Sequence, residues 1–112
     1  MDTVQVDDAT LHQLYEHLSV WEKLEDRRLA EKVDEQWVPA RTGWCSGGRS
    51  YYARILNAAG ERIGRVHYLD CPDGVTRAWP KDIHLGGVRL SRSGHEHGTA
   101  PRLTTSRWSL LP

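Results

Sequence analysis

Two turn sequences constrain the fold of this chain more than any other feature: Asn-Ala-Ala-Gly at residues 57–60 and Cys-Pro-Asp-Gly at residues 71–74. Both end in glycine, which adopts the left-handed backbone conformation without a steric penalty, and the second has proline at its second position. Each lies between segments that carry β-branched and aromatic residues, so each predicts a β-hairpin. The two hairpins predict three antiparallel strands, roughly over residues 50–56, 62–69 and 75–79.

The same turns predict which residues face each other across the strands. A type I turn with a left-handed glycine pairs Asn57 with Glu61 and sets the register of the first hairpin. The further pairs expected from the two turns are Ile55 with Ile63, Tyr51 with His67, Leu69 with Arg77, and His67 with Trp79. Gly86-Gly87 predicts a third hairpin with a two-residue turn, although a bulged single strand fits the same residues.

The segment before these strands has helical periodicity. Apolar residues at three- and four-residue spacing predict a first helix with Asp7 or Asp8 as its N-cap, and they are Leu11, Leu14, Tyr15 and Leu18. The apolar pattern continues to about residue 37, and the proline at position 39 requires the helical part to end near residue 38.

The sequence leaves the number of helices open. Ser19 and Glu22 have the spacing of a capping box, so a second helix can begin at Val20 after a tight break. One helix that continues unbroken to Trp37 fits the same residues. Both versions have an acidic face turned to solvent.

The fold class that follows is α+β, with one or two N-terminal helices packed on a three- to four-stranded antiparallel meander that is possibly small-barrel-like. A length of 112 residues predicts a single domain over residues 1–112. Its expected parts are an acidic helical part over 8–38, an antiparallel sheet over 50–90 and an irregular basic tail over 91–112.

The charge of the chain is unevenly distributed although the total is zero. Residues 1–40 hold ten acidic and four basic residues, a net charge of −6, whereas residues 41–112 hold five acidic and eleven basic residues, a net charge of +6. This split predicts either a basic surface for an anionic partner or neutralisation of one part by the other within the fold.

Several classes of protein and site have no support in the sequence. No apolar run is long enough to span a membrane and the N-terminus has no signal-peptide pattern, so we expect a cytoplasmic protein. Cys45 and Cys71 are expected to be reduced thiols. His95-Glu96-His97 resembles a metal-binding fragment, but these cysteines are too far apart to complete a structural zinc site, so we expect no metal and no cofactor.

The leading functional hypothesis is a small nucleic-acid-binding regulatory or accessory protein of bacterial type, without catalytic activity. If the turn registers hold, Tyr51, His67 and Trp79 form one row on the sheet, with arginines on the same face. Rings interleaved with arginine suit a single strand, because bases stack on rings and phosphates bind guanidinium groups. The same face also suits ordinary core packing against the helices, which would expose the opposite face instead. The candidate nucleic-acid-binding residues are Arg54, Arg62, Arg65, Arg77, Tyr51, Tyr52, Arg89 and Arg92.

Two alternative hypotheses use other residues. A metal-independent, toxin-like ribonuclease needs a base, an acid and a cation near the phosphate, and His67, His84 and Glu61 are the candidates for its catalytic residues. A protein–protein interaction module without a nucleic-acid role would use Trp21 or Trp37 of the N-terminal helices to form a homodimer or to hold a protein partner.

Overall fold

The computed structural model describes residues 2–93 and 99–105. Within these ranges the chain forms two α-helices and one seven-stranded, mostly antiparallel sheet, so the α+β class is confirmed. The elements, in chain order, are β1 (Asp2–Val6), α1 (Asp8–His17), α2 (Val20–Glu25), β2 (Ala30–Pro39), a 3-10 turn (Gly43–Cys45), β3 (Arg49–Leu56), β4 (Arg62–Asp70), β5 (Val75–Leu85), β6 (Val88–Arg92) and β7 (Arg102–Thr105).

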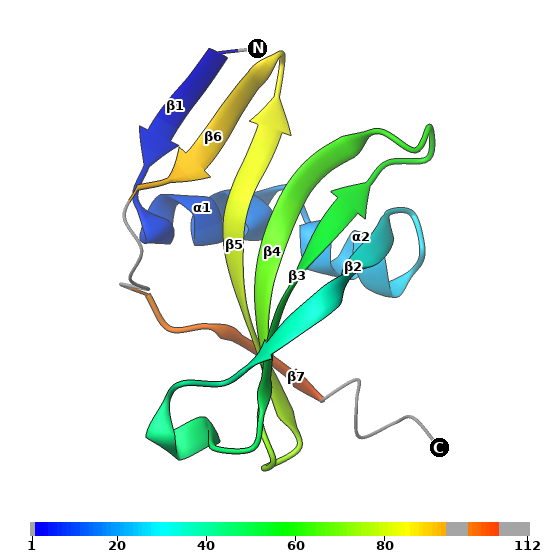
Figure 1. Ribbon diagram of the computed structural model, residues 1–112. Helices are drawn as coiled ribbons and strands as arrows, with labels where there is room; N and C mark the ends of the chain where they lie inside the picture. The colour runs from blue at the N-terminus through cyan, green and yellow to red at the C-terminus, as the bar shows by residue number, and fades with distance from the viewer. Residues whose placement is uncertain (1, 94–98, 106–112) are drawn as a thin grey trace.

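The sheet has the order β1-β6-β5-β4-β3-β2 (Figure 1). Strands β2 to β6 form an antiparallel meander, while β1 lies parallel to β6. β7 pairs with the first four residues of β5, and β6 pairs with its last four. The prediction of three to four strands is therefore wrong in number. The hydrogen-bonded order of the described strands ends at β1 and β2, so the sheet is curved but not closed into a barrel.

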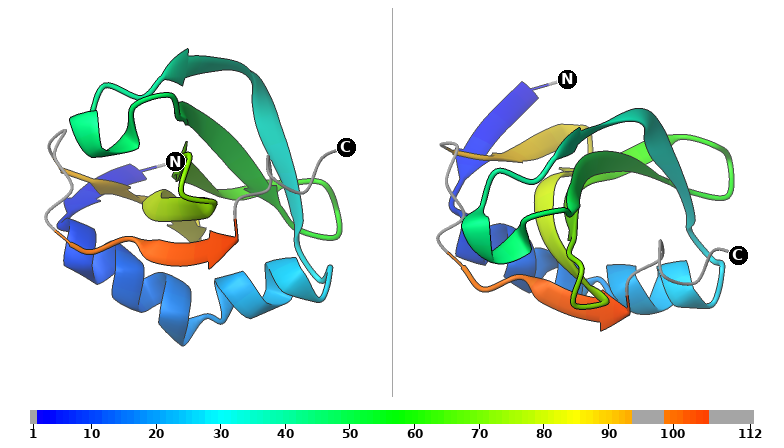
Figure 2. Two further views of the ribbon diagram at one scale, coloured as in Figure 1. Left: turned by 90° about the horizontal axis from the view of Figure 1, so that it is seen from below. Right: turned by 60° about the horizontal axis from the view of Figure 1, so that its bottom comes forward.

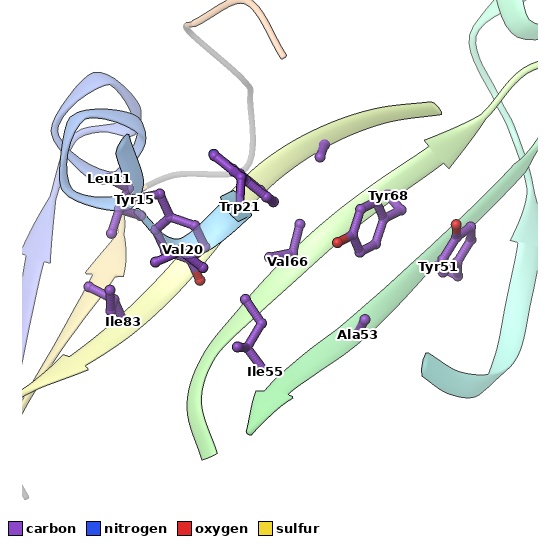
Figure 3. Close-up of a cluster of buried hydrophobic side chains, with 11 residues drawn as sticks. Leu11, Tyr15, Val20, Trp21, Tyr51, Ala53, Ile55, Val66, Tyr68 and Ile83 are labelled. Atoms are coloured by element: carbon purple, nitrogen blue, oxygen red, sulfur yellow. The ribbon is translucent and has the colours of Figure 1, made fainter. Parts of the chain in front are cut away.

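The helices lie across the concave side of the curved sheet (Figure 2). Asp7 caps α1 as predicted, since its carboxylate accepts a 2.7 Å hydrogen bond from the backbone N–H of Thr10. The predicted apolar stripe of α1 faces the sheet. With residues of α2 and the strands it forms the core shown in Figure 3, which comprises Leu11, Tyr15, Val20, Trp21, Tyr51, Ala53, Ile55, Val66, Tyr68, Ala78 and Ile83.

One close contact joins α1 to the middle of the sheet. The buried Tyr15 hydroxyl donates a 2.7 Å hydrogen bond to the backbone carbonyl of Asp82 in β5. Burial is the main cause that raises the pKa of this phenol, so it stays a neutral donor. The hydroxyl fits because β4 has glycine at position 64, where a Cβ would lie 2.5 Å from the Tyr15 oxygen.

We expect Gly64→Ala to lower the free energy of unfolding by about 1–3 kcal/mol, because the added methyl group overpacks this contact. Urea unfolding of the variant measures the effect. Gly43→Ala is the matched control, since a Cβ there meets no atom within 4 Å and the backbone is not left-handed. Equal stabilities of the two variants would contradict the close contact.

Both predicted turns are present. In the first, the N–H of Asn57 donates to the carbonyl of Glu61 at 2.9 Å, and Gly60 has a φ of 80°. In the second, the N–H of Gly74 donates to the carbonyl of Cys71. The predicted pairs Leu69 with Arg77 and His67 with Trp79 are confirmed. Gly86-Gly87 forms the two-residue hairpin, since Leu85 pairs with Val88.

The predicted register of the first hairpin is wrong by one residue. Ile55 pairs with Gly64 and Leu56 with Arg62, which leaves Ile63 as the extra residue of a β-bulge. Beyond the bulge Tyr52, not Tyr51, lies opposite His67. A shift of one residue turns a side chain to the other face of a sheet. Tyr51 therefore faces the helices, and its ring stacks on Tyr68 at a centroid distance of 5.4 Å.

The expected helical part over residues 8–38 is too long. Helices α1 and α2 are separate, as one of the two versions predicts, but α2 ends at Glu25 and residues 30–39 form β2. Arg27, at a φ of 65°, reverses the chain between them. The segment Ala30–Pro39 becomes a strand because it pairs with the free edge of β3, and this pairing outweighs its helical residue preferences.

Two further expectations about the second half need correction. The tail over residues 91–112 is not irregular throughout, because β6 extends to Arg92 and Arg102–Thr105 form β7. The expectation of reduced thiols is wrong: Cys45 and Cys71 form a disulfide, with their Cα atoms 5.0 Å apart. The turn at residues 71–74 brings Cys71 back beside the loop that carries Cys45, although 26 positions separate them in sequence.

Candidate nucleic-acid interface

The face of β3, β4 and β5 that points away from the helices carries a row of three neighbouring rings; it is the face turned to the viewer in Figure 1. Tyr52, His67 and Trp79 lie in register on these three strands. The ring centroids of Tyr52 and His67 are 5.1 Å apart, and those of His67 and Trp79 are 5.7 Å apart. We call this side the outer face. The row predicted around Tyr51 thus exists, with Tyr52 in its place.

Two cations cover the Tyr52 end of the row. The Arg65 guanidinium carbon lies 4.3 Å from the centroid of the Tyr52 ring, and Lys81 Nζ lies 4.6 Å from it. Such distances give favourable cation–π contacts. Lys81 reaches the ring because it is the extra residue of a second bulge, where Arg65 pairs with Asp82 and Val66 with Pro80. Asp34 of β2 accepts a 3.1 Å hydrogen bond from Arg65.

Positive charge accumulates around Lys81. Partial burial is the largest cause that lowers the pKa of this ammonium group, and the charges of Arg65, Arg92 and Arg89 lower it further. Asp82 acts in the opposite direction without cancelling them. An anion placed at this cluster would relieve the repulsion among its cations. We name Lys81, Arg65, Arg89 and Arg92 the cation cluster.

A buried carboxylate holds two of the predicted arginines in place. Asp82 is 0% exposed, and its Oδ2 accepts hydrogen bonds from Arg62 Nη2 at 2.6 Å and from Arg89 Nη2 at 2.8 Å. The side chains of Arg62 and Arg89 remain about one-third exposed, at 35% and 34%. They can therefore bind Asp82 and still present N–H groups to solvent.

A pocket of about 440 Å³ opens at the other end of the ring row. Its volume is within the range of roughly 300–1,000 Å³ that is usual for small-molecule sites. Residues of β3, β4 and β5 form its floor, and the segment from the end of β2 to the 3-10 turn forms its wall. The lining residues are Val38, Pro39, Ala40, Arg41, Thr42, Trp44, Ser50, His67, Leu69 and Trp79.

The wall of this pocket is tied to the sheet. The Cys45–Cys71 disulfide packs with Leu69 and Trp79 in a small second core, outside the main one. Gly48 brings the loop so close to β4 that a Cβ would lie 2.3 Å from the carbonyl oxygen of Asp70. Trp44 is thus held at the rim while its ring stays 61% exposed.

The floor of the pocket carries one polar pair. Ser50 Oγ and His67 Nε2 are 2.7 Å apart, which is hydrogen-bonding distance for either tautomer of the imidazole. Ser50 lies on β3 and His67 on β4, at diagonal positions of the outer face. In each tautomer the serine hydroxyl keeps a further donor or acceptor site for another group.

The predicted binding residues are divided between the two faces. Tyr51 is 2% exposed on the helix-facing side, so it does not belong to the ring row. Tyr52, Arg54 and Arg65 lie together on the outer face, and Asp34 faces both arginines. The remaining candidates lie at the ends of this face: Arg77 near Trp44, Arg62 and Arg89 on Asp82, and Arg92 in the cation cluster.

The three ribonuclease candidates lie apart. Glu61 is in the first turn, where it accepts a hydrogen bond from Asn57. His67 is in register with Trp79, and His84 is five residues further along β5, roughly 15 Å away at about 3.3 Å per residue. An acid and a base that act on one phosphate must both be within hydrogen-bonding reach of it. This arrangement does not favour catalysis by the three residues.

The two tryptophans of the interaction-module hypothesis have different surroundings. Trp21 is 5% exposed and packs against Tyr15, with ring centroids 5.2 Å apart, so it belongs to the core. Trp37 lies on β2, not on a helix, and is 45% exposed with the Arg49 guanidinium over its ring at 4.8 Å. A homodimer or a protein partner at the N-terminal helices stays a prediction.

Sequence reasoning missed Lys81, Trp44 and the Ser50–His67 pair. Lys81 lies on the outer face only because of its bulge, and the residues at that position do not predict a bulge. The Trp44-Cys45 dipeptide in a glycine-rich loop is the one usable signal, because a disulfide at Cys45 orders its neighbour.

Comparison with known proteins gives no relative: no protein-family model, curated protein or solved structure matches the chain. Across residues 2–93 and 99–105, no three His, Cys, Asp or Glu side chains are grouped so as to hold a metal ion. The His95-Glu96-His97 fragment lies outside the described residues. No helix in the described part of the chain is long and apolar enough to cross a membrane.

Proposed function

We propose that the protein binds single-stranded nucleic acid through the outer face of β3, β4 and β5 and catalyses no reaction. The observation that carries this proposal is the pair of cations at the end of the ring row, where the Arg65 guanidinium carbon and Lys81 Nζ lie 4.3 and 4.6 Å from the centroid of the Tyr52 ring. Phosphates bind cations, and unpaired bases stack on flat rings. A double helix buries the flat faces of its bases, so rings beside cations favour a single strand.

The charge distribution supports the same face. Most cations of the second half lie on β3 to β6, while most of the acidic residues of the first half lie on the helices and β2. Three carboxylates, those of Asp34, Asp73 and Asp82, contact the arginines of the outer face. Only Asp34 of these belongs to the first half, so on this face one half neutralises the other only in part, and the charges of Arg65 and Arg92 still act on Lys81.

The test is a salt titration of binding to short single-stranded DNA and RNA, read by fluorescence anisotropy. We expect the affinity to fall steeply with salt, because each phosphate contact releases counterions. Lys81→Ala is expected to weaken binding several-fold and to reduce the salt slope by about one. Lys23→Ala, which removes the same charge from α2 on the helix side, is the matched control and should bind like the wild type.

Absence of binding at low salt by the wild-type protein would refute the proposal. Equal affinities of Lys81→Ala and Lys23→Ala would place the contact elsewhere on the molecule. A preference between the DNA and RNA probes would show whether the 2′-hydroxyl is read.

The regulatory or accessory role and the cytoplasmic location stay predictions. Disulfides are rare in the reducing cytoplasm, so the Cys45–Cys71 pair weighs against that location. Alkylation of free thiols in native cells, followed by mass spectrometry, is the measurement that decides the redox state of the pair.

A further inference from the structure

The pocket at the end of the ring row has features that the cation cluster does not explain. A phosphate contact needs neither an apolar wall nor a polar pair on a buried floor. Val38, Pro39 and Ala40 give one side of the pocket an apolar surface, and Leu69 and Trp79 continue it below. A pocket of this kind takes a group that is largely apolar in area and polar at one edge.

Trp44 is ordered before any ligand arrives. The Arg77 guanidinium lies over its ring at 4.9 Å, and Asp73 holds Arg77 in turn through a 2.9 Å ion pair. The adjacent Cys45 is fixed by the disulfide. A ring that is exposed and already positioned loses little conformational entropy when a second ring stacks on it.

The polar pair on the floor suits the edge of a heteroaromatic ring. The Ser50 hydroxyl keeps a free donor or acceptor site beside His67, and a nucleobase carries both donors and acceptors on its edge. A purely hydrocarbon ligand would bury the remaining hydrogen-bonding site of the Ser50 hydroxyl without pairing it, which costs free energy.

The charge of the pocket favours an anionic ligand. None of the ten lining residues is acidic, and Arg41 is among them. Arg77 adds a second guanidinium at the rim, next to Trp44. A nucleotide unit has a flat ring and a phosphate close together, whereas a neutral sugar would use the rings without using the arginines.

We propose that this pocket holds one unpaired nucleobase of the bound strand, stacked on Trp44 with its polar edge against Ser50 and His67. The inference rests on the proposed function, since it names the site within that interface where a base is held. The strand would then run from the pocket along the ring row to the cation cluster.

The experiment compares Trp44→Ala with Trp37→Ala, a matched loss of an exposed tryptophan that does not line this pocket. The probes are a single-stranded oligonucleotide and the same oligonucleotide without its bases, read by anisotropy over a range of salt. We expect Trp44→Ala to weaken binding of the first probe by about 5- to 100-fold, the factor for one stacked base, with an unchanged salt slope. Binding of the abasic probe should not change.

Two companion variants separate stacking from edge recognition. Trp44→Phe keeps a ring and should restore most of the affinity. Ser50→Ala should alter the relative affinities for the four homopolymers, because it changes the polar edge of the pocket and leaves the wall intact.

The outcomes are distinguishable. If Trp44→Ala binds like the wild type while Lys81→Ala is weakened, this inference is overturned and the proposed function stands. If the wild type binds neither probe at low salt, both are overturned. Competition by a neutral oligosaccharide, but not by a mononucleotide, would also overturn the inference, because it would assign the pocket to a carbohydrate.

Discussion

Asp82→Ala is expected to lower the free energy of unfolding by about 3 kcal/mol. Removing one partner of a buried ion pair costs about 3–5 kcal/mol, because the remaining charge is left uncompensated. The lower end applies here, since Arg62 and Arg89 are about one-third exposed and can turn toward water. The variant also places two guanidinium groups side by side without the carboxylate between them. Urea unfolding measures the loss without screening the charges.

Asp73→Ala is the control for this prediction. Asp73 also pairs with an arginine, Arg77, but its side chain is about half exposed, and hydrogen bonds with Arg77 are the main cause that lowers its pKa. Water replaces an exposed pair easily, so we expect a much smaller loss than for Asp82→Ala. If the two variants are equally stable, the buried network contributes no more than a surface ion pair.

Loss of the Cys45–Cys71 disulfide is expected to cost about 3–4 kcal/mol. The bond closes a loop between positions 26 apart, and the chain-entropy model assigns that amount to a loop of this length. Urea unfolding with and without dithiothreitol measures the effect. Reduction should also weaken binding of the single-stranded probe, because it releases the wall that carries Trp44.

A double variant, Cys45→Ser with Cys71→Ser, controls for other effects of the reductant. Its stability should equal that of the reduced wild type and should not respond to dithiothreitol. A wild-type protein whose unfolding is the same in both redox states would show that the loop is held by its packing on Leu69 and Trp79 alone.

The sequence predicts those parts of the fold that depend on a few adjacent residues. The glycines at positions 60 and 74 allow the left-handed conformation that each turn requires, so both hairpins follow from their tetrapeptides. The stripe of α1 follows in the same way from its spacing, because one face of a helix must be buried.

Features that depend on distant parts of the chain are not predictable in this way. The bulges at Ile63 and Lys81 adjust the curvature of the sheet, and their flanking residues carry no signal for them. β2 is a strand because the edge of β3 is free to pair with it. Arg27 adopts a left-handed conformation that is uncommon for its residue type, so the chain reversal between α2 and β2 is not predictable from its sequence, whereas the break at Ser19 is one of the two predicted versions.

The candidate site shows the same division. The mixture of rings and arginines on one face was predictable. Side chains alternate between the two faces along a strand, and both faces of these strands carry rings and arginines in either register. The identity of its members was not, because a single bulge exchanged Tyr51 for Tyr52. Trp44 lies at the site because the adjacent Cys45 is disulfide-bonded to Cys71. Two cysteines so far apart in sequence do not predict that bond.

The parallel pairing of β1 with β6 separates the order of synthesis from the order of assembly. β1 precedes its neighbour β6 by most of the chain, since Ser93 and Val6, which are hydrogen-bonded, stand 87 positions apart. β3, β4 and β5 can pair through two short local turns before β6, the neighbour of β1, has been made. Contacts that close such long loops form slowly, because the entropy of loop closure opposes them. We therefore expect the pairing of β1 with β6 to lower the folding rate of the chain.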